Sequence, residues 1–168
     1  LRARADASQA SRHRLVACLD LELAHAHLAA REFDEGAAAA RAALAGFGPQ
    51  AARHPLAFEA QGVLAGALLE TGDARGALLA AEAHEAGWRT LAEADSARRL
   101  AADLLLARCG LVAHGKGHAP SLDRFGALEL QLEGRAPDAE REPVSGEASL
   151  VAAVREELAL ARRALARD

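Results

Sequence analysis

The sequence predicts an all-α protein built from antiparallel helix pairs. Apolar residues recur at three- and four-residue steps through most of the 168 residues, and no segment shows the two-residue alternation of a half-buried strand. Alanine, the best helix former, is abundant in a chain that is 51% hydrophobic but only 3% aromatic, with no Met or Tyr. Bulk must therefore come from leucine, and close helix approach from alanine and glycine.

The first two expected helices cover about residues 7–30 and 34–45. The apolar positions of the first are Leu15, Cys18, Leu19, Leu23, Ala26 and Ala30. Asp34 is placed to cap the second helix, since a side-chain oxygen there can accept from a free backbone N–H. Glycines and prolines between residues 46 and 55 then interrupt the periodicity.

A Thr-Gly-Asp turn joins a third helix, about residues 56–70, to a fourth that runs to about residue 86. Gly72 suits the left-handed position after a helix, and Asp73 suits the N-cap of the next one. Thr90 and Glu93 form a capping-box pattern that predicts the start of a fifth helix, which ends near residue 114.

Ser121 is placed to cap a sixth helix that ends near residue 133. The polar segment 134–146 contains two prolines and lacks periodicity, so we expect a linker or long loop. A last helix, residues 147–168, has an apolar side opposite a face of Arg and Glu. The apolar side consists of Leu150, Val154, Leu158, Ala161 and Leu165. The predicted domains are therefore 1–133, a linker, and a final helix that caps the domain or connects to a further one.

Two of the expected helix pairs share one layout and are 41 residues apart. Leu23-Ala24 in the first pair corresponds to Leu64-Ala65 in the second. The equivalent positions after these residues are Arg31, Gly36 and Ala43 in the first pair, and Gly72, Ala77 and His84 in the second. This pattern of small residues resembles the tetratricopeptide repeat family, in its longer repeats of the kinesin light chain type. The resemblance implies a right-handed superhelix of stacked pairs with a C-terminal capping helix. It leaves a generic helical bundle as the alternative fold.

The resemblance also implies a concave groove lined by the first helix of each pair. The residues that map to it are Cys18, Leu21, His25, Leu28 and Ala29 in the first unit, and Glu59, Gly62, Gly66, Leu69 and Glu70 in the second. This face is apolar and weakly acidic, so we expect a peptide or partner helix that has apolar anchors and can carry basic residues. Each of the leucines also fits an ordinary core position.

The sequence carries no recognisable catalytic or metal-binding constellation. His25 and His27 point away from each other on a helix, and His114 and His118 are separated by two glycines. We therefore expect no enzyme activity, no metal and no cofactor. Cys18 and Cys109 lie in apolar helical segments, where reduced buried thiols are expected and a disulfide between them stays open.

A formal net charge of −4 argues against a dedicated nucleic-acid binder. No charge-free run of 18 apolar residues and no signal peptide are visible, which predicts a cytoplasmic protein without membrane insertion. The chain is rich in Arg, with a single lysine, as in GC-rich bacterial genomes, and begins at Leu1, so an excised domain is one expectation.

By resemblance, the expected function is a non-catalytic interaction scaffold within a bacterial signalling or regulatory protein. The alternative is a helical regulatory domain that senses a small molecule. Self-association through the final helix is also left open.

Overall fold

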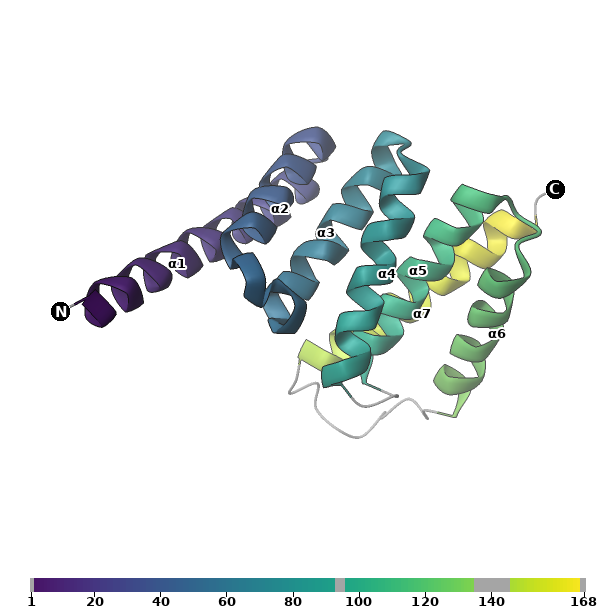
Figure 1. The fold of residues 1–168 in the computed structure, drawn as a ribbon. Coiled ribbons are helices and arrows are strands. Elements are labelled where there is room, and N and C mark those ends of the chain that lie inside the picture. Colours follow the sequence, from purple (N-terminus) through teal and green to yellow (C-terminus); the bar gives the residue numbers. More distant parts are fainter. Residues whose placement is uncertain (1, 93–95, 135–145, 167–168) are drawn as a thin grey trace. The chain divides into compact units, whose positions relative to one another are not determined.

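The computed structural model describes residues 2–92, 96–134 and 146–166, which form α-helices, one 3-10 helix and no strand (Figure 1). This confirms the all-α prediction for the described residues. The elements are α1 (Arg2–Ala29), α2 (Phe33–Phe47), η1 (Gly48–Arg53), α3 (Pro55–Thr71), α4 (Ala74–Leu91), α5 (Ala97–His114), α6 (Ala119–Glu133) and α7 (Gly146–Leu165). The chain divides into two compact units, Leu1–Gly87 and Trp88–Asp168, each described below by itself.

The turn between α3 and α4 forms as the sequence predicts. Gly72 follows α3 with φ of 86°, in the left-handed region that glycine adopts without a steric penalty. Asp73 then caps α4, because its Oδ1 accepts a 2.9 Å hydrogen bond from the backbone N–H of Gly76. The two residues reverse the chain direction between consecutive helices.

Two other predicted helix starts are wrong by two and three residues, since the N-caps are Glu32 and His118 where Asp34 and Ser121 were expected. α2 begins at Phe33, so Asp34 lies in its first turn and not at the cap, where its charge still favours the helix N-terminus. α6 begins at Ala119, and Pro120 in its first turn fits a helix start without needing a backbone donor. Ser121 is therefore inside the helix, and its hydroxyl contacts His118 at the N-cap.

The predicted capping box at Thr90 is also wrong, since α4 continues through Thr90 to Leu91. The buried indole of Trp88, with the Arg98 guanidinium 4.9 Å from its ring centroid, favours this extra helical turn. α5 begins later and is capped by Ser96, whose Oγ accepts from the N–H of Arg99 at 3.4 Å. Glu93 lies outside the described residues.

The buried face of α1 is not the face that the leucine pattern predicted. Leu15, Leu19 and Leu23 are exposed, whereas the core positions are Ala17, Leu21 and Ala24. A Cβ on Gly46 of α2 would lie 2.8 Å from the Cβ of Ala17. The two helices therefore approach through alanine and glycine, and a leucine at this crossing would hold them apart.

The same principle governs the packing of α3 against α4. Gly87 of α4 is so close to Phe58 of α3 that an added Cβ would lie under 3.0 Å from ring atoms. Gly62 of α3 similarly accommodates the imidazole of His84, which would be 2.7 Å from a Cβ there. Each glycine thus makes room for a ring from the facing helix.

The second unit has a leucine-rich core formed by α5, α6 and α7. Its buried members include Leu100, Phe125 and Leu128, joined by Val154 and Leu158 from α7. The predicted apolar face of the last helix is thus confirmed at its centre. α7 lies beside α5 and α6 within this unit, and most of segment 134–146 lies outside the described residues. The predicted domain limits remain a prediction.

Candidate interaction surface

Two of the predicted groove residues, Leu28 of α1 and Gly66 of α3, lie near each other in the first unit. α1 and α3 are in contact within the first unit. A Cβ on Gly66 of α3 would lie 3.8 Å from Cδ2 of Leu28 on α1, an ordinary van der Waals contact. Leu28 and Gly66 are both half-buried, so part of this junction faces solvent.

The other predicted groove residues differ in their exposure. His25 and Glu70 are exposed, while Glu59 and Leu69 are half-buried. Leu21 is only 2% exposed, so it belongs to the core and its assignment to an accessible groove is corrected.

Gly62 is also removed from the open surface, because His84 of α4 covers it. The His84 ring nitrogen Nδ1 donates to the carbonyl oxygen of Phe58 at 2.6 Å, which fixes the ring against α3. Burial lowers the pKa of His84 below its usual value of 6.5, opposed by that hydrogen bond and by the charges of Glu59 and Glu85. The neutral imidazole is therefore a packing and hydrogen-bonding group between two helices.

Three other histidines make local contacts. Nδ1 of His27 lies 2.6 Å from Oε2 of Glu32, across the end of α1. The rings of His114 and His118 are 4.5 Å apart, and Nδ1 of His118 lies 2.9 Å from Oγ of Ser121. Ser121 is 3% exposed and packs against Gly110, so its hydroxyl is closed to a substrate and this pair serves the start of α6.

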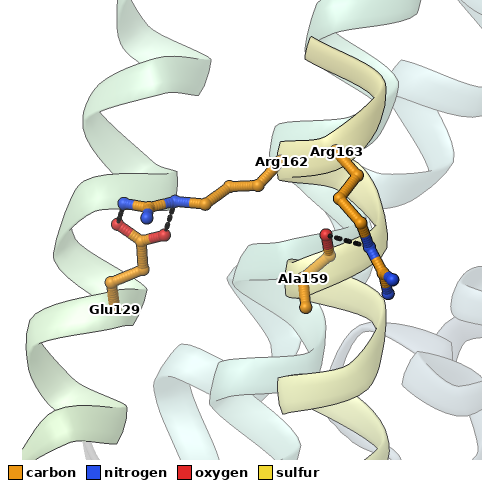
Figure 2. Close-up of polar contacts among 4 residues, drawn as sticks. All are labelled: Glu129, Ala159, Arg162 and Arg163. Carbon is orange, nitrogen blue, oxygen red and sulfur yellow. Dashed lines mark hydrogen bonds and ion pairs between the residues drawn. The ribbon is translucent and has the colours of Figure 1, made fainter. Parts of the chain in front are cut away.

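A cavity of about 450 Å³ lies between α6 and α7 in the second unit and opens to solvent. Figure 2 shows Arg162 reaching from α7 to α6, where its guanidinium engages both carboxylate oxygens of Glu129. Nearby, Arg163 donates to the carbonyl of Ala159 at 3.2 Å, and Arg155 donates to the carbonyl of Leu132 at 2.9 Å. Arg162 and Arg155 therefore join α7 to α6, whereas the contact of Arg163 stays within α7.

Neither a metal site nor a membrane span occurs among the residues described. No group of three or more His, Cys, Asp or Glu side chains there is arranged to hold a metal ion. None of the described helices combines the length and the apolar character that crossing a membrane requires. Both cysteines are free, Cys109 buried and Cys18 half-exposed, so the expectation of burial holds for one of them.

No family model matches the chain, and no curated protein or solved structure matches it either. Membership of the tetratricopeptide repeat family therefore stays a prediction.

Proposed function

We propose that this chain is a non-catalytic scaffold that binds a peptide or a partner helix along the surface formed by α1 and α3. The observation that carries the proposal is the proximity of Leu28 and Gly66, since a Cβ on Gly66 would lie 3.8 Å from Cδ2 of Leu28. The two residues were assigned to one groove from two predicted repeats. As the resemblance implies, the scaffold serves a larger bacterial signalling or regulatory protein.

Equivalent environments at a spacing of 41 residues support the repeat on which this surface depends. Ala24 and Ala65 are both fully buried at their helix crossings. Arg31 and Gly72 both follow the first helix of a pair with positive φ, 63° and 86°. A left-handed arginine is unusual, and its occurrence at the predicted glycine position favours a shared turn geometry over chance.

The chemistry of the surface favours a ligand with apolar anchors and positive charge. Leu28 of α1 and Leu69 of α3 offer half-exposed apolar area. Glu59 and Glu70 of α3 supply negative charge. Apolar contacts provide most of the affinity in such helix-in-groove recognition, and charges select the partner.

The test compares three baits in pull-downs from a bacterial lysate: wild type, Leu28→Glu/Leu69→Glu, and the control Leu79→Glu. Leu79 is an exposed leucine on α4 of the same unit, so it matches the change in charge and hydrophobicity away from the surface. Circular dichroism melts establish that all baits are folded. The recovered protein is then purified and its affinity for each bait is measured by calorimetry.

We expect the double variant to weaken binding at least about tenfold, because losing one buried apolar anchor costs roughly 1.5–3 kcal/mol. The Leu79→Glu control should bind like wild type. Equal affinity of all three folded baits would contradict the proposal. In that case a thermal shift with a metabolite would favour the small-molecule-sensing alternative.

A further inference from the structure

The outward face of α1 is an apolar strip that the fold of its own unit leaves uncovered. Leu15 and Leu19 are 63% and 61% exposed, and Val16 and Leu23 beside them are also exposed. These residues lie opposite the buried positions Ala17, Leu21 and Ala24 of the same helix. The N-terminal half of α1 also projects beyond α2 in the first unit (Figure 1).

We propose that this face binds α1 of a second copy of the chain, with the two helices antiparallel. The exposed strip follows a heptad pattern in which positions 12, 19 and 26 alternate with positions 15, 22 and 29. In an antiparallel pair each residue of the first set faces one of the second set. A two-fold axis level with residue 17 places Leu15 against Leu19 of the other copy, and Leu19 against its Leu15.

Charge complementarity selects this occupant and this register. The same axis places Arg12 of each copy opposite Glu22 of the other, so two ion pairs flank the four leucines. Both side chains are exposed, and neither has a hydrogen-bond or ion-pair partner among the described residues. They are ten residues apart on one helix, about 15 Å along its axis, so they cannot pair within one chain. A parallel pair would instead face Arg12 with Arg12.

The flanks of the strip fit the same arrangement. Val16 and Leu23 lie on one edge of the strip, where they extend the apolar contact. Cys18 lies on the other edge, one residue from the two-fold axis, so the two Cys18 thiols of a dimer flank the same edge. Cys18 is half-exposed, whereas Cys109 is buried and does not compete for a cross-linking reagent.

The test is sedimentation equilibrium of the full 168-residue chain over a range of concentrations. One helix face makes an interface smaller than the standard size, so we expect dissociation on the order of micromolar concentrations and a mass that rises from 17.5 kDa toward twice that value. Leu15→Glu/Leu19→Glu should remain monomeric at every concentration. The control Leu79→Glu, an equally exposed leucine on α4, should dimerise like wild type.

A charge exchange tests the register. Arg12→Glu and Glu22→Arg alone should each weaken the dimer several-fold, because they create two like-charge contacts, and the double exchange should restore it. A short bismaleimide should couple wild-type dimers through Cys18, and Cys18→Ala should abolish the coupling.

A wild type that stays monomeric, or dimers that survive Leu15→Glu/Leu19→Glu, would overturn the proposal. Failure of the double exchange to restore the dimer would overturn the antiparallel register. These variants leave Leu28 and Leu69 intact, so the outcome is separate from that of the α1–α3 binding surface.

Discussion

The close contact between Gly87 and Phe58 predicts that adding a single methyl group will destabilise the first unit. In Gly87→Ala the new Cβ would lie under 3.0 Å from atoms at the base of the Phe58 ring. Phe58 is buried between α3 and α4, so its ring cannot swing into solvent. Either the ring leaves its rotamer or the two helices separate.

Two effects of opposite sign set the change in the free energy of unfolding caused by Gly87→Ala. Alanine is favoured over glycine in a helix by about 1 kcal/mol, whereas overpacking a core costs about 1–3 kcal/mol. The matched control is Gly66→Ala in α3 of the same unit, where the nearest atom, Cδ2 of Leu28, is 3.8 Å from the new Cβ. This control keeps the helix-propensity gain without the clash. The difference between the two variants therefore isolates the overpacking cost.

The assay is urea unfolding followed by circular dichroism, together with amide hydrogen exchange of α3 to follow the first unit specifically. We expect Gly87→Ala to lose about 1 kcal/mol relative to wild type, and Gly66→Ala to gain about the same. Replacing Phe58 with leucine should cost less in the Gly87→Ala background than in wild type, because the smaller side chain relieves the contact. If both glycine variants are more stable than wild type, the argument from close helix approach is refuted.

Two further predictions concern titratable groups. Because burial lowers the pKa of His84 below 6.5, the unfolded chain binds its proton first as pH falls. The contribution of neutral His84 to the stability of the first unit should be fully present above about pH 6.5 and decline as the pH falls below that value. In His84→Gln, the denaturation midpoint should no longer show this part of the pH dependence. Burial also raises the pKa of the Cys109 thiol to about 11, against a smaller opposite effect of Arg108. A thiol reagent should therefore label Cys18 alone in the native protein and both cysteines in denaturant, whereas labelling of Cys109 in the native state would contradict its burial.

Local turn chemistry was predictable from the sequence where backbone geometry decides it. Gly72 and Asp73 form the expected turn because few other residues supply a left-handed position followed by a side-chain cap. Thr90 failed as a cap because the buried Trp88 favours continuation of α4, and a capping pattern carries no information about burial. Helix ends that depend on tertiary contacts were therefore not predictable from the local sequence pattern.

The spacing of the predicted surface residues carried less information about which of them solvent reaches. The 41-residue spacing assigned Leu28 and Gly66 to one groove, and in the first unit the two residues lie near each other. The same mapping gave Leu21 and Gly62 as groove residues, although one is buried in the core and the other is covered by His84. A repeat register specifies which helix face a residue occupies, but a bulky residue on the neighbouring helix decides whether solvent reaches it.

The face of α1 that the unit buries is decided by size, and hydrophobicity alone misleads. The helix carries one strip with Leu15 and Leu19 and another with Ala17 and Ala24, and both follow helical periodicity. A ranking by hydrophobicity buries the leucine strip, yet close approach to Gly46 of α2 is sterically open only to the alanine strip. The leucines are then left on the outside, where most of their apolar area stays exposed. In such an alanine-rich chain, exposed leucines in a heptad pattern are available for contacts with another molecule, because the closest intramolecular crossings require the smaller residues.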